Sequence, residues 1–239
     1  MTYRKTFTFD GTVSTTYGLY ITGQQTYNSA ERDYSFYEIP GRSGDLLAPF
    51  GRWKNQLIVY PAFIAGSDFE TNYKALRAFL TSHVGYYRLE DDYNPGEYRI
   101  AAFSGTIEPT ISQYFKSGTF NITFNAKPQR WLTIGETATE FTADGTITNP
   151  TLFDAAPIIR AYGDGTIGIG TDEITIAANT YPYIDIDCDL GNAFYDTVNC
   201  NSLVSVTGTD FPKLHPGANG ITIDGNLTSI EIIPRWFTL

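Results

Sequence analysis

The sequence has no long apolar run, and it is poor in cysteine. Without a run of about 18 apolar residues it predicts no membrane-spanning helix. Its first residues, MTYRKTFTFDG, lack the apolar segment of a secretory signal peptide. The two cysteines, Cys188 and Cys200, are too few to predict a disulfide framework in a chain of 239 residues. We therefore expect no membrane insertion, and synthesis and assembly in a cytoplasm.

Nucleotide-binding and hydrolase motifs are absent or out of place. There is no Walker sequence and no G-x-S-x-G. Gly163, Gly165 and Gly168 match G-x-G-x-x-G, but the residues that follow are patterned as a strand. A pyrophosphate site needs a helix N-terminus at that place. A glycine-rich hairpin is the better interpretation, and we predict no cofactor.

Histidines and clustered acids offer little more chemistry. His83 and His215 are the only histidines, and we expect structural roles because one ends a helix and the other lies in a proline-rich turn. Asp185, Asp187 and Asp189 alternate with apolar residues, and carboxylates two residues apart on a strand are separated by roughly 6–7 Å. That spacing is too wide to close a calcium site without loop ligands. We therefore expect a solvated face, no metal, no catalytic residue and no enzyme activity.

Charge is divided unevenly along the chain. Residues 1–130 carry 13 basic and 12 acidic side chains, whereas residues 131–239 carry 3 and 14, so the net charges are +1 and −11. This shift predicts a domain boundary near residue 130, with KPQRWLTIGE (127–136) as the link. The acidic half cannot hold a nucleic-acid backbone by bulk charge, because such binding needs cations.

Turn residues and alternating patterns predict a protein that is mainly β. Four Asp-Gly pairs occur, and the last, Asp224-Gly225, lies between two alternating segments in ITIDGNLTSIEII. Such a pair favours a type I′ turn, so this segment predicts a β-hairpin. Further strands are predicted by the aromatic, β-branched or alternating segments at 3–9, 55–64, 119–126 and 184–189.

One helix is predicted, in SDFETNYKALRAFLTSH (67–83). Ser67 as the N-cap, with Glu70 three residues later, matches a capping box. Four residues then fall on one face at helical spacing: Phe69, Tyr73, Leu76 and Leu80. The first half is therefore expected to be a β domain with one packed α-helix, and the second half wholly β.

The order of several sequence blocks resembles the distal tail protein (Dit) family of siphophages that infect Gram-positive bacteria. In the first half these blocks are PGRSGDLL, GRWKNQLIVYPAFI, the capped helix with LTSHVGYYRLEDDYNPGEYRIAAFSGTIEPT, and GTFNITFNAKPQRW. In the second half NPTLFDAAPIIRAYGDG, FPKLHPGANGI and IEIIPRW resemble the galectin-like β-sandwich of the same family. The resemblance implies a ring-forming tail domain at 1–131 and a galectin-like sandwich at 132–239.

The resemblance also implies a function, a set of partners and a location. Members of the family form a ring of six identical subunits, a homohexamer, at the distal end of the phage tail. They are not enzymes. The ring joins the tail tube protein to the tail-tip hub protein, with receptor-binding or baseplate proteins as further candidates. DNA would be only a passing cargo, which favours a neutral or acidic pore wall.

The stretch GRSGDLLAPFGRWKN (41–55) is the candidate assembly surface. Under the resemblance, Arg42, Asp45, Arg52 and Lys54 would form pairs between subunits or towards the tube, while Gly41, Gly44 and Gly51 permit tight turns. The alternative is an ordinary exposed loop whose charges only solvate it.

Two other functions stay open at this point. A carbohydrate-binding module or adhesin for cell-wall glycans would use an exposed aromatic platform, for which Tyr181, Tyr183 and Trp236 are the candidates. A glycan hydrolase would need two inward-facing carboxylates at catalytic separation, and no pair stands out.

Overall fold

The computed structural model describes residues 4–22, 27–66, 68–112 and 116–239. The chain divides into two compact units, Met1–Arg130 with Leu239 and Trp131–Thr238. We call them the N-terminal unit and the C-terminal unit; the division falls where the charge changes and one residue before the predicted boundary. The described residues form many short strands and one α-helix, which confirms the mainly β fold class.

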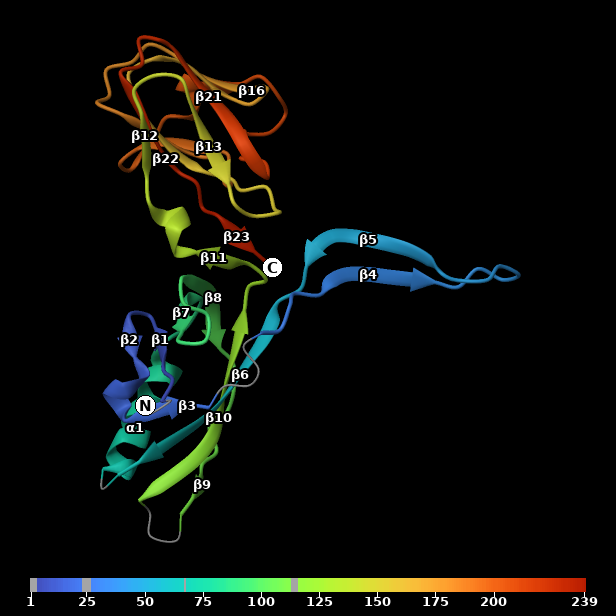
Figure 1. Cartoon of the computed structure of the whole chain (residues 1–239), viewed down its shortest axis with the longest axis vertical. Helices are drawn as coiled ribbons and strands as arrows, with labels where there is room; N and C mark the ends of the chain where they lie inside the picture. The colour runs from blue at the N-terminus through green and yellow to red at the C-terminus, as the bar shows by residue number, and fades with distance from the viewer. Residues whose placement is uncertain (1–3, 23–26, 67, 113–115) are drawn as a thin grey trace. The chain divides into compact units, whose positions relative to one another are not determined.

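The N-terminal unit is built on an antiparallel sheet with strand order β2-β1-β7-β8-β10-β6-β3, and β9 pairs with β10 (Figure 1). The longest pairing joins β6 and β10 along their whole lengths, from Gln56↔Ala126 to Ala65↔Ser117. The strands are β1 (Phe7–Phe9), β2 (Thr12–Val13), β3 (Leu19–Ile21), β6 (Gln56–Ala65), β7 (Tyr87–Asp91), β8 (Glu97–Phe103), β9 (Thr110–Ile111) and β10 (Ser117–Ala126), and η1 (Ser14–Tyr17) is a 3₁₀ turn.

Helix α1 (Phe69–Ser82) packs in the core of this unit, as predicted. Phe69, Leu76 and Leu80 are buried, while Tyr73 is partly buried and donates a hydrogen bond to the Ile107 carbonyl at 2.8 Å. Alternate residues of β6 and β10 complete the core, namely Ile58, Tyr60, Ala62, Ile64, Phe120, Ile122 and Phe124. Sheet and helix thus share one apolar interior.

The start of α1 differs from the predicted capping box. Asp68 is the N-cap, and its side chain makes no capping hydrogen bond. Glu70 instead accepts a hydrogen bond from Lys74 at 2.6 Å, one helical turn away. The predicted cap, Ser67, lies outside the described residues.

The C-terminal unit is a sandwich of two antiparallel sheets, in agreement with the predicted β-sandwich. The six-stranded sheet has the order β12-β22-β14-β17-β18-β19 and the five-stranded sheet β13-β21-β15-β16-β20 (Figure 1). The strands are β12 (Thr139–Phe141), β13 (Gly145–Asn149), β14 (Ile158–Tyr162), β15 (Gly165–Ile169), β16 (Asp172–Ile176), β17 (Ile184–Asp187), β18 (Asn192–Tyr195), β19 (Val198–Asn199), β20 (Val204–Val206), β21 (Gly217–Gly225) and β22 (Ser229–Ile233). The short strands β11 (Arg130–Leu132) and β23 (Phe237–Thr238) pair with each other, and η2 (Thr133–Glu136) and η3 (Asn201–Leu203) are 3₁₀ turns.

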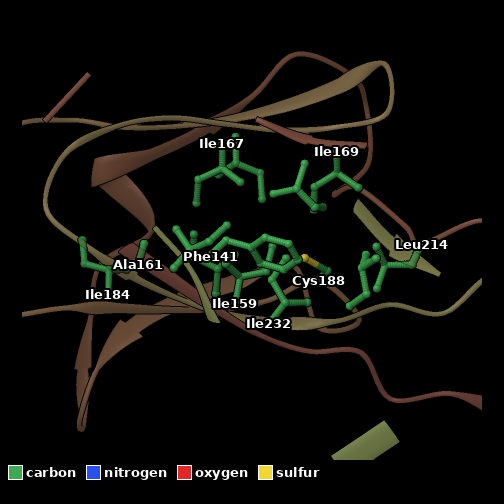
Figure 2. Close-up of a cluster of buried hydrophobic side chains, with 14 of the residues drawn as sticks. Phe141, Ile159, Ala161, Ile167, Ile169, Ile184, Cys188, Leu214 and Ile232 are labelled. Atoms are coloured by element: carbon green, nitrogen blue, oxygen red, sulfur yellow. The ribbon is translucent and has the colours of Figure 1, made fainter. Parts of the chain in front are cut away.

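Side chains from both sheets meet in the sandwich core (Figure 2). Isoleucines dominate it, for example Ile159 and Ile232 from the six-stranded sheet and Ile167 from the five-stranded sheet. Cys188 lies in the same core, and burial raises the pKa of its thiol to about 12. Cys188 and Cys200 are both free thiols.

The Asp-Gly pairs do not all make hairpins. Asp10-Gly11 does: β1 and β2 pair across it, and both residues have positive φ. The hairpin predicted at Asp224-Gly225 is wrong, because β21 and β22 belong to different sheets. Gly225 instead pairs with Gly165, where a Cβ on Gly225 would lie 2.8 Å from the Gly165 Cα. Here the glycines permit close backbone approach where the chain passes between sheets.

Candidate functional site: an exposed arm

The predicted assembly stretch lies in a two-stranded antiparallel hairpin. Its strands are β4 (Arg32–Tyr37) and β5 (Leu46–Trp53), which pair with each other as a separate sheet. Figure 1 shows this hairpin as a long ribbon that leaves the sheet where β5 leads into β6. We call residues 32–53 the arm.

Three glycines shape the arm, two in the tight turn predicted for them and the third, Gly51, within a strand. Gly41 and Gly44 have φ values of 79° and 84° at the tip, a conformation that side chains rarely adopt. Gly51 has a φ of 71° within β5, opposite the register shift between Arg32 and Tyr34. That combination is a β-bulge, which bends a strand and increases its twist.

Two of the four predicted assembly charges are paired within the arm and its base. Arg52 contacts Asp33 at 2.7 Å, and Lys54 contacts Glu31 at 2.8 Å. The hydrogen bond to Glu31 raises the pKa of Lys54 above its ordinary value. These residues therefore have partners within the same chain, and they do not need another subunit as a partner.

The other two charges, Arg42 and Asp45, lie at the tip. Among the described residues neither forms an ion pair within 4.0 Å. With Glu38, Ile39 and Pro40 they line a hollow of about 510 Å³. Of the predicted charges, these two are the ones that remain available to another molecule.

Apolar side chains on the arm form the feature that the sequence analysis missed. Five of them are between 47 and 65 % exposed: Phe36, Tyr37, Leu46, Leu47 and Phe50. The pairs Phe36↔Leu47 and Tyr37↔Leu46 are adjacent in register, so they point to opposite faces of the hairpin. No residue of β4 or β5 belongs to the core of the N-terminal unit as described. The sequence did carry a signal for them. Consecutive apolar residues, as in Phe36-Tyr37 and Leu46-Leu47, place apolar side chains on both faces of a strand, whereas a strand with one wet face alternates apolar and polar residues.

The predicted sugar platforms are not free surfaces. Trp236 is only 5 % exposed and lies in the sandwich core, so it cannot present a face to a ligand, and its assignment as a platform is wrong. Tyr181 and Tyr183 are half-buried, and both lie against Tyr195, with ring centroids 5.1 and 4.9 Å away. The guanidinium of Arg160 lies over Tyr183 at 4.2 Å.

The aspartates of β17 are not a solvated face, contrary to the prediction. Asp185 and Asp187 are each 8 % exposed. Asp185 accepts two hydrogen bonds from Arg160, and Asp187 pairs with Arg235 at 3.1 Å. Distant arginines therefore neutralise carboxylates that the local sequence pattern places in water.

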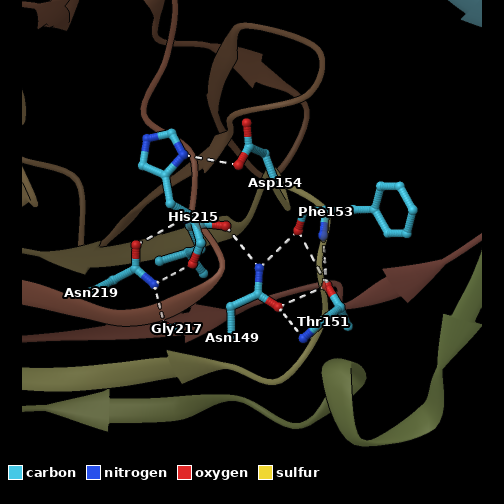
Figure 3. A network of polar contacts seen from close by, with 8 residues as sticks. Asn149, Thr151, Phe153, Asp154, His215, Gly217 and Asn219 are labelled. Carbon is cyan, nitrogen blue, oxygen red and sulfur yellow. Dashed lines mark hydrogen bonds and ion pairs between the residues drawn. The ribbon is translucent and has the colours of Figure 1, made fainter.

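Both histidines make contacts within the fold. The His83 ring lies among Phe9, Phe79 and Tyr87 and contacts Asp10 at 3.1 Å. His215 contacts Asp154 at 2.9 Å in the polar network of Figure 3.

That network is organised by two buried asparagines. Asn149 donates to the carbonyls of Phe153 and Leu214, and Asn219 donates to those of His215 and Gly217. These bonds fix loops around the histidine, so the cluster is a structural one.

The described part of the chain has neither a metal-binding cluster nor a membrane-spanning helix. No group of three or more His, Cys, Asp or Glu side chains there could hold a metal ion. No helix there is long and apolar enough to cross a membrane.

Comparison with solved structures gives matches over the whole chain. The crystal structure of the SPP1 Dit (gp 19.1) protein, described as a paradigm of the hub adsorption apparatus in Gram-positive infecting phages, matches with a TM-score of 0.73 and 14 % identity. The match covers 98 % of this chain and 99 % of that chain. Two structures of the phage P2 baseplate in its activated conformation, with Ca and with Sr, match with a TM-score of 0.51 at 13 % and 12 % identity, covering 95 % of this chain and 97 % of those chains. No protein-family model and no curated protein matches the sequence. The chain thus shares the fold of the SPP1 Dit protein, and identities this low show the fold alone.

Proposed function

We propose that this chain is a structural hub protein at the distal end of a phage tail, where six copies form a ring. The ring joins the tail tube to the tail-tip proteins, and receptor-binding or baseplate proteins attach to it. DNA passes through the ring as cargo, and the protein has no catalytic role. The shared fold and the sequence resemblance support the proposal, and the arm is the observation that carries it.

The arm would gain stability from a partner that covers it. A two-stranded hairpin on its own is marginally stable in water, and a long apolar edge exposed to solvent promotes aggregation. Phe36 and Leu47 on one face and Tyr37 and Leu46 on the other would be covered if the arm lay against a second copy. Apolar and aromatic anchors of this kind carry most of the binding energy in protein interfaces.

The family resemblance, and not the arm alone, favours a ring over a two-fold dimer, because two arms could also exchange reciprocally in a dimer. In a ring, the arm of each copy seats on a different surface of the next copy, which is a head-to-tail contact. Such contacts generate a closed ring when the rotation between copies closes. Arg42 and Asp45 at the tip supply charges that fix the register of this contact.

Solution mass by light scattering, with negative-stain images of the same sample, tests the proposal. We expect particles with a central hole and a mass about six times the 26.6 kDa of the chain. A mass of 26.6 kDa at every concentration, with no rings in the images, would contradict self-assembly of the free protein.

A further inference from the structure

The outer face of the six-stranded sheet in the C-terminal unit carries a pocket. Arg160 of β14 pairs in register with Glu231 of β22 and Asp185 of β17, so these residues share that face. Phe194 of β18 extends the row beyond Asp185. A pocket of about 300 Å³ opens over the row, lined by Ile158, Arg160, Asp185, Phe194, Glu231 and Ile233.

The polar side chains of this pocket are held in place by one another. Arg160 donates from Nε and Nη2 to the two oxygens of Asp185, at 2.7 and 2.9 Å. The Tyr162 hydroxyl donates to Oε1 of Glu231 at 2.9 Å. The guanidinium of Arg160 also lies over the ring of Tyr183, and this contact further restricts the Arg160 side chain. A site whose side chains are already ordered loses less entropy when a ligand binds.

The pocket combines apolar surface with a net negative charge. Ile158, Ile233 and Phe194 contribute hydrocarbon and aromatic surface, and one guanidinium faces two carboxylates. The described residues donate no hydrogen bond to Oε2 of Glu231, so this oxygen can accept one from a ligand. An anionic ligand would be repelled by the net charge. A neutral ligand with hydroxyl groups on one side and C–H groups on the other fits both parts.

We propose that this pocket binds a neutral saccharide. One pyranose ring packs its C–H face on Phe194 and the neighbouring isoleucines, and its hydroxyl groups donate to Glu231 and Asp185. The inference concerns the C-terminal unit, and it does not depend on ring formation through the arm.

A purely structural role explains only part of the row. Opposite charges on neighbouring strands stabilise a sheet, which accounts for Arg160 between Asp185 and Glu231. It does not account for the half-buried Phe194 ring at the pocket wall or for the open oxygen of Glu231. These two residues therefore separate a binding role from a structural one.

The test screens the full chain against immobilised neutral oligosaccharides of glucose, galactose, rhamnose and N-acetylhexosamines, with polyglycerol phosphate and sialylated glycans as anionic probes. The best neutral oligosaccharide is then titrated by calorimetry against the parent and two variants. Phe194→Ala removes the ring, and Glu231→Gln removes the charge but keeps an oxygen for Tyr162. Each variant should lower the affinity by about tenfold, the size of one lost aromatic contact or charge-assisted hydrogen bond.

Matched controls come from elsewhere in the same unit. Phe211→Ala removes a half-buried ring that lines a different pocket, and Glu173→Gln changes an exposed acid of the other sheet. Both should bind within about twofold of the parent, because neither touches the site.

Three results would overturn the inference. They are no binding to any neutral oligosaccharide, binding confined to the anionic probes, and parent-like affinity in Glu231→Gln. The last variant keeps its contact geometry, so its result stands even if Phe194→Ala does not fold.

Discussion

The sandwich and the arm place their apolar side chains in opposite ways. In the sandwich, the apolar residues of both sheets face each other, and Ile159, Ile167 and Ile186 are fully buried. In the arm, Phe36, Tyr37 and Phe50 are more than half exposed. The sandwich can satisfy its apolar surface within one chain, whereas the arm cannot. Under the proposed function the arm is one half of an interface, and the predictions that follow test this difference.

The largest expected difference is in folding stability. Ile186→Ala in the sandwich core should lower the free energy of unfolding by about 2–5 kcal/mol, because it leaves a cavity. Phe36→Ala in the arm should change it by no more than about 0.5 kcal/mol, because its side chain is exposed in the single chain. Chemical denaturation of dilute, unassembled protein measures both. Similar losses for the two variants would show that the arm is part of the fold of one chain.

Removing an ion pair should likewise lower the free energy of unfolding more in the sandwich than in the arm. Arg160→Met would leave Asp185 buried without its partner, at a cost of about 2 kcal/mol after allowing for the 39 % exposure of the Arg160 side chain. Arg52→Met removes a partner of Asp33 at a site where the Arg52 side chain is 74 % exposed, and it should cost about 0–0.5 kcal/mol. Denaturation midpoints give both values, and a costly Arg52 variant would refute the contrast.

Alkaline pH should weaken the sandwich through Cys188. Its thiol has a pKa of about 12 in the fold, raised from 9 by burial, so the unfolded chain loses the proton first. The contribution of this thiol to the free energy of unfolding is fully present below pH 9. It is lost as the pH rises towards 12, by up to about 1.4 kcal/mol for each pH unit. Cys188→Ala should be less stable at pH 7, yet lose less stability between pH 9 and 11. Equal pH dependence in parent and variant would contradict this assignment.

Reversing two charges of the arm should have the smallest effect on folding stability, although it should prevent assembly of the ring. Arg42→Glu combined with Arg52→Glu should leave a folded monomer that no longer forms rings, because it reverses the available charge at the tip and places a second carboxylate beside Asp33, where Arg52 pairs at the arm's base. Exposed ion pairs contribute only about 0–1 kcal/mol each, so the double change is needed. Arg77→Glu, an exposed cation of α1, serves as the control for added negative charge. Rings that form at parental protein concentration in the double variant would exclude a role for these charges.

Local sequence patterns predicted the helix and strands well where an element has one buried face and one solvent-exposed face. The β10 alternation and the apolar face of α1 were both confirmed, because period and burial are coupled within one element. The hairpin predicted at Asp224-Gly225 was wrong, since turn residues indicate that the chain reverses but do not determine which sheet the next strand joins. Pairing is decided by the whole sandwich.

Residues whose environment comes from distant parts of the chain could not be predicted. Asp185 and Asp187 looked solvated because Arg160 and Arg235, which bury and pair them, are 25 and 48 residues away. Trp236 was a candidate platform because aromatic faces can stack on sugars, and the local sequence does not show that the sandwich core covers it. For the arm, charge drew attention to Arg52 and Lys54, while the exposed apolar residues of β4 and β5 carry the argument for assembly.

The most direct test of the account compares the mass of the parent with that of an arm variant. Phe36→Ser, Leu47→Ser and Phe50→Ser together remove exposed apolar residues of the arm. The control Val84→Ser, Leu152→Ser and Leu190→Ser removes the same number of apolar residues elsewhere, which are even more exposed. By light scattering, the parent and the control should form rings, and the arm variant should remain at 26.6 kDa with an intact fold. An arm variant that keeps the ring mass would contradict the claim that the arm joins the subunits.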